Sequence, residues 1–277
     1  MSYKGIVVHV DNSVRSKIRI EFARILAERF DAHLTGVFTI GRIEIPGYLR
    51  AELGDALMRG RDESVSQQKK AAEQYFFDHA SGLRPSRIEF HAIDGDPVQA
   101  MLAPSQYADL LIVGQSESPP PRAATVSSSF PEDLVLASKR PTLVIPYVGE
   151  FTAAFEYPTI AWKPSGEANR AVRDALPILA QAKRVTVVCV GDTEDLPVGY
   201  GSEIALYLAR HNVPVEVVHD HSGLSDVGIA LLNQACDLQS DLIVMGCYGH
   251  SRLREMALGG VSRTILTSMT VPVLFAH

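Results

Sequence analysis

The sequence has few cysteines, no excess of basic charge and no long apolar run, and each absence excludes a class of protein. Three cysteines are too few, and an odd number, for a disulfide framework, so a reducing, cytoplasmic setting is expected. A net charge of −6 provides no overall basic field to attract nucleic acid or an anionic membrane. No apolar stretch approaches the ~18 residues that span a bilayer, and no signal peptide is expected before the first apolar segment, residues 6–10. We therefore expect a soluble protein without nucleic-acid or membrane partners.

The composition that remains is that of an ordinary globular protein. Hydrophobic residues make up 46% of the chain and charged residues 21%, which excludes intrinsic disorder and coiled-coil architecture. The 277 residues are nearly twice the roughly 150 of a typical domain. The length therefore allows either two domains or one large α/β unit.

An internal repeat decides between these alternatives. The segment 109–114, Asp-Leu-Leu-Ile-Val-Gly, returns 132 residues later as 241–246, Asp-Leu-Ile-Val-Met-Gly. Thr35 and Thr186, in the expected second strand of each copy, are instead 151 residues apart. The separation falls by about 19 residues between the second and fourth strands, which predicts an insertion of that size in the first copy, at about residues 40–60.

Two homologous domains, residues 1–148 and 155–277, explain this repeat, and strands alternate with helices in both. The strands are near-continuous apolar runs such as 185–190, which is typical of a parallel sheet covered on both faces. The pattern predicts an α/β fold of two tandem, open, doubly wound, five-stranded parallel-sheet domains, with ligands beyond the carboxyl ends of the strands. The expected strands are 4–10, 33–39, 87–93, 109–114, 142–146, 158–162, 184–190, 213–219, 241–246 and 271–275. The expected helices are 14–30, 61–81, 96–107, 130–138, 167–181, 200–211, 225–239 and 260–268.

A glycine-rich loop follows the fourth strand of the second domain. Gly246 and Gly249 are followed, after nine residues, by Gly259 and Gly260, which open the last helix. Glycine lets backbone N–H groups approach an anion closely, and the N-terminus of a helix favours a phosphate. Ser262 adds a hydroxyl donor. The alternative is that these glycines serve only tight turns and a helix cap.

This spacing, Gly-x2-Gly-x9-Gly after an Asp-Leu-Ile-Val-Met-Gly strand, resembles the motif of the universal stress protein family. The resemblance covers both halves and implies a Rossmann-like domain of the HUP type in tandem. It also implies a stress-response protein that binds ATP, alone or with Mg²⁺. The motif positions implied to hold ribose and phosphates are Gly246, Gly249, Gly259, Gly260, Val261 and Ser262. His250, Lys163 and Val190 complete the candidate set of this domain.

Each domain departs from the family pattern at a different place. The family places an aspartate after the first strand to contact adenine, and the first domain has Asp11 followed by Ser13. The second domain has Lys163 there, which offers only donors; it could reach a phosphate, pair with an acidic residue at 192 or 194, or be solvated. Gly260 also replaces a serine or threonine that is common in the family.

The first domain lacks the second glycine of the motif. Gly114 is followed by Glu117 and three prolines at 119–121, which remove N–H donors and add a repelling charge. We therefore predict that this half is degenerate for a nucleoside triphosphate. Asp11, Ser13 and Gly114 remain its candidate ligand residues.

No catalytic residue can be named from the sequence. Dinucleotide, P-loop and nucleophile-elbow motifs do not occur, and no complete acid–base constellation is found. His219 and His221 suggest a metal site at first sight, but a polar strand end is favoured, and no metal ligands are assigned. The leading interpretation is an adenine-nucleotide-binding protein of the stress response that binds mainly at its second domain, with slow hydrolysis at most. The alternative is a nucleotide-independent interaction or scaffold protein that senses another small ligand.

Two further expectations concern architecture. The insertion at 41–60 is interpreted as a flap over the first crevice, with an exposed docking surface as the alternative. As the family resemblance implies, the C-terminal strands, 142–146 and 271–275, should pair with each other, because this would cover two open sheet edges. The chain would then form a pseudo-dimer, and a homodimer of whole chains stays open.

Overall fold

A computed structural model describes residues 2–40, 47–116, 126–191, 199–221, 226–247 and 260–277, and strands alternate with helices through both halves. The elements of the first half are β1 (Gly5–Val10), α1 (Ser16–Phe30), β2 (His33–Ile40), α2 (Gly47–His79), η1 (Pro85–Arg87), β3 (Ile88–Asp94), α3 (Pro97–Ser105), β4 (Leu110–Gly114), α4 (Phe130–Ser138) and β5 (Thr142–Ile145). Those of the second half are β6 (Pro158–Ala161), α5 (Gly166–Leu179), β7 (Val185–Val190), α6 (Ser202–Arg210), β8 (Val215–Asp220), α7 (Val227–Asp237), β9 (Leu242–Gly246), α9 (Val261–Ser268) and β10 (Val273–Ala276).

The strands form one sheet of ten, in the order β3-β2-β1-β4-β5-β10-β9-β6-β7-β8. Each half has the same internal order, and all pairs within a half are parallel. The halves meet through the antiparallel pair β5–β10, in which Val144 lies opposite Val273 and Leu143 opposite Leu274. The expected pairing of the C-terminal strands is confirmed, and the mirrored strand order makes the chain a pseudo-dimer of two tandem domains.

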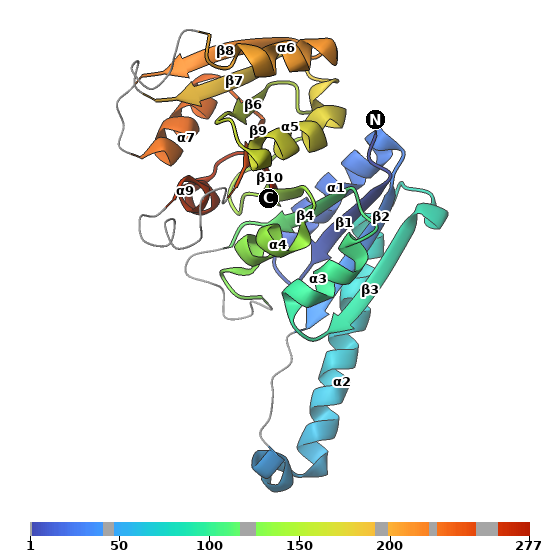
Figure 1. The fold of residues 1–277 in the computed structure, drawn as a ribbon. Helices are drawn as coiled ribbons and strands as arrows, with labels where there is room; N and C mark the ends of the chain where they lie inside the picture. The colour runs from blue at the N-terminus through green and yellow to red at the C-terminus, as the bar shows by residue number, and fades with distance from the viewer. Residues whose placement is uncertain (1, 41–46, 117–125, 192–198, 222–225, 248–259) are drawn as a thin grey trace.

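Helices cover both faces of this sheet (Figure 1). Helices α1, α2, α5 and α6 contribute to one apolar core, and α3, α4, α7 and α9 contribute to the other. The central strands are buried on both faces, as their near-continuous apolar sequences predicted. The doubly wound α/β fold is therefore present in both halves. The exact boundaries at 148 and 155 stay a prediction.

Helix α2 differs from its expected start at 61. It begins at Gly47 and runs for 33 residues. Its C-terminal part packs on the sheet, where a Cβ at Gly36 would lie 2.7 Å from the ring of Phe76. Its N-terminal part projects away from the domain (Figure 1). The insertion thus lengthens a helix instead of folding over the crevice, and the flap interpretation is wrong for residues 47–60; residues 41–46 lie outside the described chain.

Side-chain hydrogen bonds reinforce the junction between the halves. The Gln115 amide donates to the carbonyl oxygens of Leu266 (2.9 Å) and Thr267 (3.1 Å) at the end of α9. The Tyr3 hydroxyl donates to the carbonyl of Asp174 at 2.7 Å. The two domains are therefore held together by more than one strand pair.

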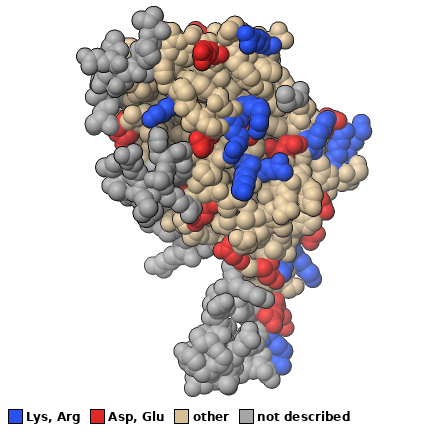
Figure 2. Space-filling model, in the orientation of Figure 1, with Lys and Arg blue, Asp and Glu red and all other residues tan. Residues whose placement is uncertain are grey.

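Charges of both signs are interspersed on the described part of the face shown in Figure 2, with a group of basic side chains near its middle. Among the described residues, no helix is long and apolar enough to cross a membrane.

Candidate functional site

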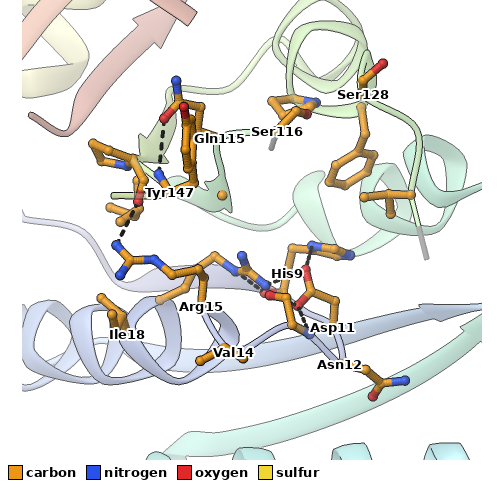
Figure 3. Close-up of a pocket in the computed structure, with 18 of the residues that line it drawn as sticks. His9, Asp11, Asn12, Val14, Arg15, Ile18, Gln115, Ser116, Ser128 and Tyr147 are labelled. Carbon is orange, nitrogen blue, oxygen red and sulfur yellow. Dashed lines mark hydrogen bonds and ion pairs between the residues drawn. The ribbon is translucent and has the colours of Figure 1, made fainter. Parts of the chain in front are cut away.

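A cavity of about 440 Å³ lies at the carboxyl ends of β1 and β4, where the strand order of the first domain reverses (Figure 3). In doubly wound sheets, ligands bind at this point. The volume falls in the range of small-molecule sites. The turn after β1, the end of β4, the start of α4 and the end of β5 contribute its wall. The lining residues are His9, Asp11, Asn12, Ser13, Val14, Arg15, Ile18, Arg19, Gly114, Gln115, Ser116, Val126, Ser127, Ser128, Phe130, Pro131, Ile145, Pro146 and Tyr147.

A buried ion pair forms the floor of this cavity. Nη2 of Arg19 lies 2.8 Å from Oδ2 of Asp11, and Nε of Arg19 donates to the carbonyl of His9 at 2.7 Å. Oδ1 of Asp11 accepts from the backbone N–H (2.9 Å) and hydroxyl (2.5 Å) of Ser13. Burial opposes ionisation of Asp11, but Arg19, His9 and the Ser13 hydrogen bonds hold the pKa of its carboxyl well below the usual range. Asp11 is therefore ionised, and both of its oxygens already have partners.

His9 lies beside this pair and is fully buried. Its ring packs against Phe130 with centroids 4.7 Å apart, and Nε2 lies 3.3 Å from the Thr39 hydroxyl. Burial lowers the pKa of His9 to about 4, and the carboxylate of Asp11 only partly opposes this. His9 is therefore neutral at physiological pH.

The structure brings together Asp11, Ser13 and Gly114, the first-domain candidates, in this one cavity. A Cβ at Gly114 would collide with the guanidinium of Arg19, so the packing of Arg19 is sufficient to require glycine there. Sequence reasoning missed His9, Arg15, Arg19 and Gln115. The sequence did contain one signal for Arg19. This arginine lies on the same face of α1 as Phe22 and Leu26, and a charged residue on a buried helix face indicates a buried partner.

In the second domain, three of the described candidates, Gly260, Val261 and Ser262, lie together at the start of α9. Gly260 is the N-cap in an extended conformation, without a side-chain cap, and Ser262 in the first turn is buried. The first turn of α9 has no acidic residue, and Arg263 lies there, exposed. The start of α9 therefore presents N–H groups and the charge of Arg263, while the Thr264 hydroxyl of the same turn donates to the carboxylate of Asp226 at 3.2 Å.

The corresponding helix of the first domain begins very differently. Its first turn contains Pro131, which lacks an N–H, followed by Glu132 and Asp133. Two carboxylates at a helix N-terminus compete with any bound anion for the same positive potential. The two domains thus differ in the charge of the first turn of this helix.

The remaining second-domain candidates are dispersed or lie outside the described residues. A Cβ at Gly246 would lie 2.6 Å from the carbonyl carbon of Glu167 and 2.9 Å from Cα of Ala168, so close packing of α5 accounts for this glycine. Lys163 is exposed after β6, and Val190 is half-buried at the end of β7. Gly249, His250 and Gly259 lie outside the described residues, as do Glu117, the prolines 119–121 and the acidic positions 192 and 194.

The paired histidines at the end of β8, His219 within the strand and His221 just after it, have ordinary backbone partners. Nε2 of His219 lies 2.8 Å from the carbonyl of Tyr200, and Nδ1 of His221 lies 2.9 Å from that of Gly191. No group of three metal-ligating side chains occurs among the residues that the structure places. A second, more open cavity of about 820 Å³ lies between α5 and α6; its wall includes Trp162, Arg170, Arg173, Tyr200 and Tyr207.

Comparison with known proteins identifies the family. The model of the universal stress protein family matches residues 2–146 and again 159–277, so this chain belongs to that family, in its tandem two-domain form. No curated protein matches the sequence.

Solved structures share this fold over nearly the whole chain. A universal stress protein from Archaeoglobus fulgidus DSM 4304 is 17% identical with a TM-score of 0.73, and the match covers 98% of this chain and 95% of that one. A putative universal stress protein from Pseudomonas aeruginosa UCBPP-PA14 is 16% identical with a TM-score of 0.61, covering 99% and 93%. A functionally unknown protein from Pseudomonas aeruginosa PAO1 has the same identity and TM-score, covering 99% and 92%.

Proposed function

We propose that this protein binds an adenine nucleotide, ATP in the first place, in its second domain, with the phosphates at the N-terminus of α9. Nucleotide occupancy would then act as a signal in a stress response, in the cytoplasm. The observation that carries the proposal is the contrast between the first turns of α9 and α4.

At α9 the features that favour phosphate coincide. The N-cap is glycine, which has no side chain of its own to occupy the N–H groups of the first turn or to shield them from a ligand. Ser262 adds a hydroxyl, and Arg263 adds a positive charge that can form a charge-assisted hydrogen bond. At α4, by contrast, Glu132 and Asp133 would lie beside any polyphosphate.

The proposal is one of binding, with slow hydrolysis at most. It assigns no catalytic residue, and Mg²⁺ would accompany ATP without a dedicated set of protein ligands. A signalling role needs only that the bound and free forms differ in what they present to a partner.

Calorimetric titration with ATP tests this proposal by a reciprocal charge exchange. Arg263→Glu should weaken ATP binding by one to two orders of magnitude, because it replaces a cation beside phosphate with a carboxylate. Glu132→Arg, at the corresponding position of α4, should leave the affinity of the second domain unchanged. Unchanged binding by a folded Arg263→Glu variant would contradict the assignment of phosphate to α9.

A second pair of variants tests the glycine motif. Gly249→Asp should nearly abolish binding, by roughly two to four orders of magnitude, because it removes charge-assisted hydrogen bonds and adds a carboxylate. Glu117→Gly should change binding little. Mass spectrometry of small molecules released from freshly purified protein by denaturation shows directly whether nucleotide copurifies.

The first-domain cavity favours the alternative function, a protein that senses another small ligand. This alternative would be favoured by two results together. The folded wild type would show no detectable ATP binding, and denaturation would release a different molecule. Light scattering in the presence and absence of ATP would test whether whole chains form a homodimer.

A further inference from the structure

We infer that the cavity of the first domain is a separate site for a small organic acid, a molecule with one anionic group and an apolar or aromatic body. This inference does not depend on nucleotide binding at α9, because it concerns a different domain and different residues.

The described wall of the cavity carries one net positive charge. Arg15 and Arg19 line it, and Asp11 is the acidic residue among its described lining. His9 is neutral, so it adds no charge at physiological pH. Asp11 neutralises Arg19, which leaves the charge of Arg15 uncompensated.

Arg15 has hydrogen-bonding capacity to spare. Its Nη2 donates to the carbonyl oxygens of Pro146 (3.1 Å) and Gly149 (2.8 Å), which holds the guanidinium at the end of β5. Its Nε is buried and has no hydrogen-bond partner among the described residues, and none of their carboxylates forms an ion pair with it. Figure 3 shows the side chain extended along the cavity toward Tyr147. Two carbonyl oxygens hold this guanidinium but no described carboxylate neutralises it, so a carboxylate or phosphate monoester in the cavity would pair with its charge.

The rest of the wall suits an apolar body. Val14, Ile18 and Val126 line the cavity together with Phe130 and Ile145. Pro131, Pro146 and Tyr147 add further carbon surface. Burial of a ring or alkyl group against these residues would supply most of the affinity, and the single charge would supply orientation.

The same geometry disfavours adenine and a polyphosphate. An adenine amino group needs a free acceptor, and Asp11 has little capacity left, because Oδ1 accepts two hydrogen bonds from Ser13 and Oδ2 is paired with Arg19. A triphosphate at the start of α4 would meet Glu132 and Asp133. A ligand with one negative charge, rather than the three or four of a triphosphate, therefore matches this cavity.

Ligand-observed NMR titration with 2-naphthoate, and with neutral 2-naphthamide as its isostere, tests the inference. Wild type should bind the acid and bind the amide at least about tenfold more weakly. Arg15→Gln should weaken binding of the acid by a similar factor and leave binding of the amide unchanged. Arg24→Gln, on the same helix but paired with Glu28 outside the cavity, is the matched control and should bind like wild type.

A second variant covers the case in which Arg15→Gln fails to fold. Ser127 is exposed at the rim, so Ser127→Trp should fold and should block both probes by filling the entrance. Arg263→Glu should leave naphthoate binding unchanged, which separates this site from the nucleotide site.

Three results would overturn the inference. They are no binding of naphthoate to folded wild type, equal binding of acid and amide, and displacement of naphthoate by one equivalent of ATP in both wild type and Arg263→Glu.

Discussion

The guanidinium of Arg19 lies over the Cα of Gly114, in the space that a side chain at position 114 would occupy. The same guanidinium holds the buried carboxylate of Asp11. In the second domain, Ala171 stands 152 residues after Arg19, and the backbone at Ala168 packs directly against Gly246. One domain therefore has an ion pair where the other has close helix–strand packing. This difference explains why a crevice lined by Arg19 lies in the first domain.

The contact between Arg19 and Gly114 should appear as a coupling energy. Gly114→Ala should destabilise the protein by about 1–3 kcal/mol, because the new Cβ displaces a buried guanidinium. Arg19→Ala should cost about 3–5 kcal/mol, because it leaves Asp11 buried without its cation. In the double variant the alanine at 114 finds space, so the two costs should not add. Urea unfolding of the wild type, the two single variants and the double variant measures this coupling energy. Strict additivity of the two losses in stability would contradict the contact between Arg19 and Gly114.

Gly246→Ala should be destabilising for a different reason. Its Cβ would meet backbone atoms of Glu167 and Ala168, which cannot rotate away as a side chain can. We expect a loss of roughly 2–3 kcal/mol in the free energy of unfolding. Gly166→Ala is the matched control, since a Cβ there meets nothing within 4 Å and the residue begins α5. Equal effects of the two substitutions would show that α5 does not pack as described.

His9 should make stability depend on pH between about 6.5 and 4. Its folded-state pKa of about 4 lies below the ordinary 6.5, so the unfolded state binds more protons in this window. Stability is therefore fully present above pH 6.5 and is lost as pH falls toward 4, by about 3 kcal/mol at most. His9→Gln should flatten this part of the profile. Parallel profiles for wild type and His9→Gln would refute the buried, neutral assignment.

Gln115→Glu should weaken the junction between the domains. The amide donates to the carbonyls of Leu266 and Thr267 and accepts from the N–H of Tyr147 at 3.1 Å. A carboxylate keeps the acceptor but points an anion at two carbonyl oxygens, so we expect a loss of roughly 2–3 kcal/mol. Gln68→Glu, on the exposed side of α2, should change stability little. Thermal unfolding of both variants compares them, and a Gln115→Glu protein as stable as its control would be the contrary result.

Much of the fold could be predicted because its signals are local. Near-continuous apolar runs such as 185–190 indicate strands buried on both faces, and the spacing of apolar residues indicates the helices between them. The repeat, with one change in its offset, indicated two domains of equal topology. The error at α2 arose because the insertion at 41–60, which mixes apolar residues with glycines, was interpreted as a flap, whereas the structure has one helix from Gly47 to His79.

The candidate site was predictable only in part. Asp11 and Gly114 follow β1 and β4, and adjacent parallel strands end at the same edge of a sheet, so their proximity follows from the topology. The roles of Arg15, Arg19 and Gln115 did not follow, because each contacts a segment distant in sequence.

The sequence by itself determined the tandem α/β domains, because periodicity and repetition can be followed along the chain, and its glycine spacing carried the resemblance to the family. Only the tertiary structure decided how the charges of the first domain are used. Arg19 is neutralised by Asp11, while Arg15 keeps a buried donor free beside an apolar wall. Burial and pairing of charge depend on which elements pack together, and this is why the cavity of the first domain became visible only once the chain was folded.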